Sequence, residues 1–186
     1  MDIVRIFFAI SNLFLLSNLN AVSDSEISRQ QNFAYEAINK FAETKANDGL
    51  QLCGIGGASK DGKKTGFELI FQTGKLFELK EARELLLKLA TEFLEDINKN
   101  EQLRPYLFQY PYPIENIRIA VLSNKYFFER DKYLASFSIN KARLGFAKGS
   151  EFDAGIINLD SAETYEEALK IVAASCENKL NSSEIK

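Results

Sequence analysis

The chain of 186 residues contains no histidine. Histidine is the usual general base near neutral pH, the base of Ser-His and Cys-His pairs, and the commonest zinc ligand. Its absence removes the most familiar routes to acid–base, nucleophilic and zinc-dependent catalysis. The sequence also lacks a calcium loop of the D-x-D-x-D-G type and any recognisable cofactor motif. We therefore expect no metal site and no cofactor, and we favour a protein that is not an enzyme.

An excess of basic residues is also lacking. The 23 lysines and arginines face 26 acidic residues, which gives a net charge of −3, and the two signs are interspersed. A nucleic-acid-binding domain would show a basic stripe and a high isoelectric point. We therefore expect no nucleic-acid partner. With 46% hydrophobic residues, the chain has enough apolar material for one globular domain with a real core.

Long apolar runs are missing except near the amino terminus. The run Ile6–Leu16 is interrupted only by Ser11 and Asn12. It is too short to cross a bilayer, which needs about 20 residues, and its length is typical of a signal-peptide core. Small residues before position 24 predict cleavage after Ser23. We thus expect residues 1–23 to be a signal peptide, and an exported, periplasmic or secreted protein without a transmembrane anchor; the alternative is an apolar helix that packs on the domain.

Cysteine is scarce, because only Cys53 and Cys176 are present. In an oxidising compartment the two could form a disulfide, and closing so long a loop would contribute roughly 4–5 kcal/mol in the chain-entropy description. The alternative is a pair of buried free thiols. The sequence leaves both alternatives open, because the distance between the two Cα atoms decides between them.

The spacing of apolar residues predicts the elements of secondary structure. Helical periodicity predicts helices at residues 25–48, 79 to about 100, and 161 to about 177. Alternation predicts strands at residues 50–58, 66–73, 116–123 and 132–139, with weaker candidates at "RLGFAK" (143–148) and "AGIINL" (154–159).

The order of these elements predicts the fold class. Most strands follow one another directly and no regular βαβ alternation is present, which favours an α+β domain. We expect two layers: an antiparallel sheet of about four to five strands, with helices packed on one face. A single domain is predicted at residues 24–178, followed by a polar, flexible tail at residues 179–186.

The stretch "CGIGGASKDGKKTG", residues 53–66, comes close to a phosphate-binding loop. It fits G-x-x-x-x-G-K, but Lys64 stands where a Ser or Thr must bind magnesium. A phosphate loop is followed by a helix, whereas a strand is predicted here. We therefore predict a β-hairpin with a tight turn at Asp61-Gly62, whose three lysines project into solvent.

All three prolines of the chain fall in "RPYLFQYPYP", residues 104–113. Aromatic residues recur there at every second position, which would place their rings on one side of an extended chain. These rings, with the arginine at the start, are the candidate binding residues: Arg104, Tyr106, Phe108, Tyr110 and Tyr112. One interpretation is a stacking surface for a sugar, a peptide or a partner's aromatic side chain. The other is a rigid crossover whose rings cover apolar surface.

Several further segments resemble a known group of proteins. They are "EARELLLKLATEFLEDIN", "LRPYLFQYPYP", "IRIAV" and "YEEALKIV", and the block Arg104-Pro105-Tyr106-Leu107 with Tyr110-Pro111 is the most specific. They resemble small, uncharacterised exported proteins of chlamydia-like intracellular bacteria. The resemblance implies export and a shared fold, and it implies no activity.

These observations favour an exported, non-enzymatic protein that binds another envelope or host protein through residues 104–113. The alternative is an exported enzyme that acts on a glycan through two carboxylates flanking a cleft. Its candidate carboxylates are those of the second and third predicted helices: Glu92, Glu95, Asp96, Glu163, Glu166 and Glu167. A third possibility is a small-ligand carrier with a cavity between the sheet and the helices.

Overall fold

The computed structural model describes residues 24–125, 132–149 and 163–183. The predicted signal peptide at residues 1–23 and the weak strand candidate at residues 154–159 lie outside the described residues. Within them, the long helices are α2 (Asp24–Ala46), α3 (Leu79–Lys99) and α5 (Tyr165–Ser183). The strands are β1 (Leu50–Lys60), β2 (Lys63–Thr73), β3 (Ile117–Ser123), β4 (Leu134–Asn140), β5 (Arg143–Lys148) and β6 (Glu163–Thr164).

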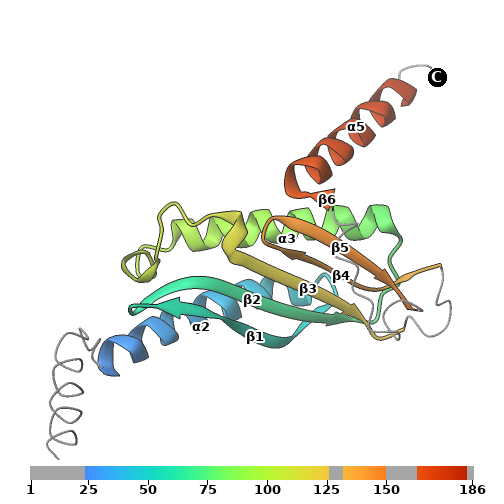
Figure 1. The fold of residues 1–186 in the computed structure, drawn as a ribbon. Coiled ribbons are helices and arrows are strands. Elements are labelled where there is room, and N and C mark those ends of the chain that lie inside the picture. Colours follow the sequence, from blue (N-terminus) through green and yellow to red (C-terminus); the bar gives the residue numbers. More distant parts are fainter. Residues whose placement is uncertain (1–23, 126–131, 150–162, 184–186) are drawn as a thin grey trace, which may run out of the picture.

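The strands form one sheet in the order β1-β2-β3-β4-β5-β6, which confirms the predicted α+β class (Figure 1). The sheet differs from the prediction in two respects: it has six strands, and β2 and β3 pair in parallel. The other neighbouring pairs are antiparallel. The parallel pair exists because α3 connects β2 to β3, and a helical crossover brings the chain back to the same end of the sheet.

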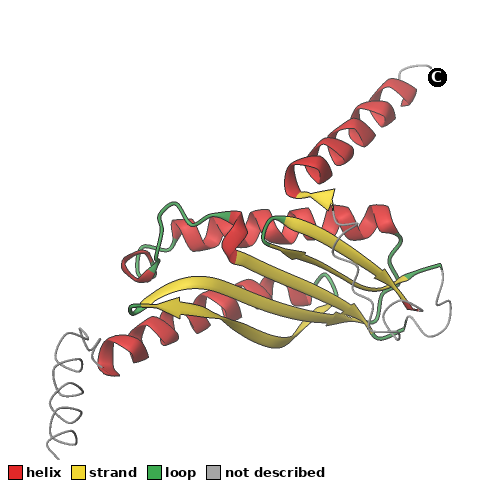
Figure 2. Ribbon diagram, viewed as in Figure 1, coloured by secondary structure: helices red, strands yellow, loops and turns green. Residues whose placement is uncertain are grey.

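The helices α2 and α3 cover one face of this sheet, as predicted for a two-layer domain (Figure 2). Each places an apolar stripe against the strands. The stripe of α3 is fully buried and consists of Ala82, Leu86, Leu89, Phe93 and Ile97. The start of α3 is stabilised by the Glu81 carboxylate, which accepts a hydrogen bond of 3.2 Å from the backbone N–H of Glu78.

Aromatic rings join the two helices to the sheet. Phe93 of α3 lies 5.0 Å from Phe41 of α2 and 5.7 Å from Phe67 of β2, measured between ring centroids. Phe67 in turn contacts Tyr112 at 5.4 Å. All four rings are almost completely buried. This cluster is the centre of the core and fixes the positions of α2, α3, β2 and the segment that carries Tyr112.

The third helix is longer than the sequence predicts. It runs from Tyr165 to Ser183, beyond the expected end near residue 177. Its first turn contacts α3, since the Tyr165 hydroxyl lies 2.7 Å from the Thr91 hydroxyl. Leu169 of this helix is 43% exposed. Among the described helices, none combines the length and apolar character that crossing a membrane requires.

Candidate binding site at the hairpin end

The hairpin β1–β2 forms as predicted, with its turn at Asp61-Gly62. Both residues have positive φ values, 50° and 69°, which are typical of the type I′ turn that suits a two-residue hairpin. A strand follows the turn, and no helix N-terminus is present to bind a phosphate group. The interpretation of residues 53–66 as a hairpin is therefore confirmed.

The aromatic segment does not follow the extended path that the sequence predicts. Residues Arg104–Tyr106 form a short 3₁₀ helix, η1, and Leu103 and Leu107 on either side are buried. This 3₁₀ turn interrupts the extended chain, so the alternation of rings is lost. The prediction that all four rings lie on one side is wrong.

Two of the four rings pack against the rest of the protein. Tyr112 is 1% exposed, and its peptide group is held by Asn98 of α3: the Tyr112 N–H donates to Asn98 Oδ1 at 2.6 Å, and Asn98 Nδ2 donates to the Tyr112 carbonyl at 3.1 Å. Burial raises the pKa of the Tyr112 hydroxyl, which has no hydrogen-bond partner among the described residues. Tyr106 is half-buried, with its ring 5.8 Å from that of Phe33 on α2. The burial of these two rings agrees with the interpretation that the segment is a crossover whose rings cover apolar surface.

The other two rings face solvent. Phe108 is 52% exposed and Tyr110 is 51% exposed. The Arg104 guanidinium lies over the Tyr110 ring, with its Cζ atom 4.6 Å from the ring centroid. We call these three side chains, Arg104, Phe108 and Tyr110, the contact surface.

The contact surface is joined directly to the hairpin. The Phe108 N–H donates to the Lys64 carbonyl at 3.0 Å, and Leu107 forms a parallel bridge with Lys64. The first half of α2, the hairpin turn and the segment with η1 therefore meet at one end of the molecule, on the left in Figure 1.

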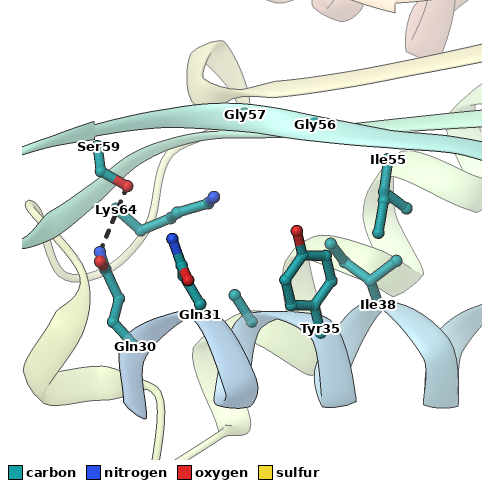
Figure 3. Close-up of a pocket in the computed structure, with 10 residues that line it drawn as sticks. Gln30, Gln31, Tyr35, Ile38, Ile55, Gly56, Gly57, Ser59 and Lys64 are labelled. Carbon is teal, nitrogen blue, oxygen red and sulfur yellow. Dashed lines mark hydrogen bonds between the residues drawn. The ribbon is translucent and has the colours of Figure 1, made fainter. Parts of the chain in front are cut away.

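A hollow of about 240 Å³ lies at this same end, between α2 and the hairpin (Figure 3). Side chains of α2 line one side, and the strands line the other. The α2 residues are Gln30, Gln31, Ala34, Tyr35 and Ile38, and the strand residues are Ile55, Gly56, Gly57, Ser59 and Lys64.

A glycine, Gly57, forms part of the strand wall of the hollow. Gly57 lies between Ile55 and Ser59, which line the same hollow. It has a φ of +143°, and a Cβ atom added there would lie 2.2 Å from the carbonyl oxygen of Gly66. The backbone conformation at Gly57 thus requires glycine.

The prediction that all three hairpin lysines project into solvent is wrong for Lys64. Lys60 and Lys63 are exposed, whereas Lys64 is half-buried in the hollow. Thr65 has no partner across the hairpin, because Ala58 pairs with Gly66 and Ser59 pairs with Lys64. This bulge shifts the alternation by one residue and turns Lys64 towards the same face as Phe67.

The Lys64 ammonium group has unusual surroundings. Its nitrogen lies 5.4 Å from the centroid of the Phe67 ring, and burial lowers its pKa from the usual value. In the part of the chain that the structure describes, no carboxylate lies within ion-pair distance of it. The hollow therefore contains a partly desolvated cation without an acidic partner.

Cys53 is a free, exposed thiol, and its Sγ lies 3.3 Å from the Ile70 carbonyl. Neither alternative from the sequence holds at this residue, because the thiol is neither paired with Cys176 nor buried. The topology explains the missing disulfide. Cys53 lies on the edge strand β1, whereas α5 follows β6 at the other edge, about 24 Å away across five strand spacings. A disulfide needs Cα atoms within about 7 Å.

Most of the carboxylates considered for a glycan enzyme are engaged by neighbouring groups. Glu92 pairs with Lys45 of α2, and Glu95 pairs with Lys99 at 2.8 Å. At the other end of α3, Arg83 Nε binds both oxygens of Glu163 at 2.9 Å. Hydrogen bonds from Thr164 lower the pKa of Glu167. No group of three potential metal ligands is found among the residues that the structure describes.

Comparisons of the chain with protein-family models, with curated proteins and with solved structures found no match. The resemblance to exported proteins of chlamydia-like bacteria therefore stays a prediction. Sequence reasoning identified the segment with the contact surface but missed Lys64 and the α2 residues of the hollow. The only sequence signal for the hollow was the cluster of glycines in residues 53–66.

Proposed function

We propose that this chain is a non-enzymatic binding protein that contacts another protein through Arg104, Phe108 and Tyr110. As an exported protein, it would meet this partner in the cell envelope or on a host. The observation that carries the proposal is the pair of half-exposed rings, Phe108 and Tyr110, on a segment whose flanking residues are buried.

The composition of the contact surface supports a protein partner. Tyrosine and arginine are enriched among the residues that contribute most to protein–protein binding, and phenylalanine is enriched in interfaces generally. The guanidinium group of Arg104 is already stacked on the Tyr110 ring, so little conformational freedom would be lost on binding. The Asn98 hydrogen bonds to Tyr112 and the buried Leu107 hold the backbone of the segment on either side of the rings.

The alternative, an enzyme acting on a glycan, has weaker support. Such an enzyme requires two carboxyl groups about 5 to 10 Å apart across a cleft. Four of the six candidate carboxylates are engaged by a cation or a backbone N–H: Glu92, Glu95, Glu163 and Glu167. The hollow beneath α2 is lined by none of the six.

Site-specific photocrosslinking tests the proposal in cells that make the protein naturally. p-Benzoylphenylalanine is introduced at position 108 or 110, and at positions 79 and 169 as controls. Leu79 and Leu169 are exposed to a similar degree, 47% and 43%, but lie away from the contact surface. We expect one discrete adduct with a protein from positions 108 and 110 only. Equal or absent adducts at all four positions would contradict the proposal.

The partner identified in this way is then titrated against two purified double variants. Phe108→Ser/Tyr110→Ser should weaken binding about a hundredfold, because each ring contributes roughly 1 to 2 kcal/mol. Leu169→Ser/Ile171→Ser, the matched control on α5, should leave the affinity unchanged. Both changes affect exposed side chains, so both variants should keep the melting temperature of the wild type. Equal losses of affinity in the two variants would reject the contact surface.

A further inference from the structure

The hollow beneath α2 has a polar end and an apolar end. At the polar end lie the Lys64 ammonium group, the amides of Gln30 and Gln31, and the Ser59 hydroxyl (Figure 3). Gln30 is buried, and its Nε2 atom makes a long contact of 3.5 Å with Ser59 Oγ. At the other end, Ile38 of α2 faces Ile55 of β1. The Tyr35 hydroxyl points towards the strands between the two ends.

The described lining of the hollow carries positive charge and no negative charge. Among the lining side chains that the structure describes, Lys64 is the only charged one, and the remaining polar groups are amides and hydroxyls. Burial removes water from a lysine ammonium group, and this destabilises its charged form unless a negative group replaces the lost water. No carboxylate of the described side chains reaches Lys64, so the described lining is complementary to an anion.

We propose that this hollow binds a small organic monocarboxylate. The carboxylate of the ligand pairs with the Lys64 ammonium and accepts hydrogen bonds from the Gln31 amide and the Tyr35 hydroxyl. The apolar body of the ligand lies between Ile38 and Ile55. The site is distinct from the contact surface, and the inference goes beyond the proposed function.

Two features favour a carboxylate over a phosphate group. A phosphate carries up to two negative charges and is normally bound by arginine forks or by backbone N–H groups at a helix N-terminus. The hollow offers one lysine and no arginine, and its α2 wall begins at Gln30, in the second turn of the helix. One positive charge with neutral donors balances a single negative charge.

The size and opening of the hollow restrict the ligand to a small molecule. Pockets for drug-sized ligands have volumes of about 300–1,000 Å³, and this hollow has about 240 Å³. Tyr35 and Ile55 are 49% and 40% exposed, so a ligand can enter beside them without any change of the core. A single aromatic ring or a short aliphatic chain attached to the carboxylate fits these limits.

Isothermal titration calorimetry of the full chain with defined probes tests the proposal. The probes are benzoate and hexanoate, their neutral analogues benzamide and hexanamide, and inorganic phosphate. We expect at least one carboxylate to bind with 1:1 stoichiometry, and its amide analogue to bind at least tenfold more weakly, because the charged hydrogen bond is lost. Phosphate should bind more weakly than the carboxylate.

Variants assign the binding to the hollow. Lys64→Met should reduce the affinity for the carboxylate at least tenfold, whereas Lys63→Met, a change of the exposed neighbouring lysine, should leave it unchanged. Gln31→Ala changes an exposed side chain and provides a second test that does not depend on the fold of the hairpin; it should weaken binding about threefold. The Phe108→Ser/Tyr110→Ser variant should bind the carboxylate like the wild type.

Three results would overturn the proposal. The first is binding of benzamide or hexanamide as tightly as the corresponding carboxylate. The second is equal affinity of the carboxylate for the Lys64→Met and Lys63→Met variants. The third is the absence of binding by both carboxylates at millimolar concentrations. None of these results would bear on the contact surface, which is tested with residues outside the hollow.

Discussion

The two helices on the same face of the sheet pack against it in different ways. Beneath α3, the side chains of Leu89, Phe93 and Ile97 are completely buried against the strands. Beneath the first half of α2, the corresponding space is the open hollow that contains Lys64. The residues on the two sides also differ: Gln30 and Gln31 line the hollow on the helix, and Gly56 and Gly57 line it on the strand.

This contrast agrees with the proposed division between scaffold and binding regions. The closely packed α3 fixes Tyr112 through Asn98, and Tyr112 holds the segment that carries the contact surface. At the end beneath α2, Lys64 has no acidic partner among the described side chains and lines the open hollow. In the proposed division, the closely packed half supports the half that binds.

The largest expected effect is the removal of a ring from the α3 half. Phe93→Ala should lower the free energy of unfolding by about 3–5 kcal/mol, because it leaves a cavity between the Phe41 and Phe67 rings. Tyr35→Ala in the wall of the hollow, where the side chain is 49% exposed, should cost less than about 1 kcal/mol. Urea denaturation of both variants measures the difference. Similar losses in the two variants would contradict the division.

The next effect concerns the glycine of the hollow. Gly57→Ala should cost about 2–3 kcal/mol, because its φ of +143° is strained for alanine and the added Cβ would approach the Gly66 carbonyl. Gly74→Ala is the matched control, because no atom lies within 3.4 Å of the Cβ position there. Thermal denaturation measures the melting temperature of both variants. An unchanged melting temperature of Gly57→Ala would contradict the predicted strain at this position.

A smaller effect is expected from Asn98, which connects α3 to the segment that carries the contact surface. Asn98→Ala removes the hydrogen bonds to the Tyr112 backbone and should lower stability by about 1–2 kcal/mol. It should also raise the rate of amide hydrogen exchange in residues 104–112, while the exchange of β4 stays slow. Uniform acceleration in both segments would indicate that Asn98 stabilises the whole fold and does not position the contact surface.

The smallest effect has the opposite sign. Tyr112→Phe removes a buried hydroxyl that has no hydrogen-bond partner among the described residues, and should stabilise the protein by about 1 kcal/mol. Burial raises the pKa of Tyr112, so the folded protein keeps this proton when the unfolded chain loses it near pH 10. Stability should therefore fall as the pH rises above about 10, and less steeply in Tyr112→Phe. Denaturation midpoints between pH 8 and pH 11 measure both effects.

The sequence predicted the elements more accurately than their side-chain orientations. The ends of α3 and the Asp61-Gly62 turn followed from local periodicity and turn chemistry, because both are determined by neighbouring residues. The parallel pairing of β2 and β3 was missed, since it depends on the path of the chain around α3.

The two features of the candidate site were predicted unequally for the same reason. The candidates from the sequence include the exposed rings Phe108 and Tyr110, but the sequence did not separate the buried Tyr112 from them, because its burial depends on α3. The inward position of Lys64 depends on the bulge at Thr65. Strict alternation from Phe67 places Lys64 on the opposite face, so no pattern of apolar residues could have identified it.

The most direct test of this account maps carboxylate binding on the whole protein by amide chemical shifts. Benzoate is added to ¹⁵N-labelled wild-type protein and to the Lys64→Met variant. We expect the shifts of the wild type to concentrate at residues 30–38, 55–59 and 64–67 and to disappear in the variant. Shifts concentrated instead on the sheet face opposite α2 and α3, around the apolar hollow of about 150 Å³ lined by Ala120, Ser138 and Gly145, would contradict it.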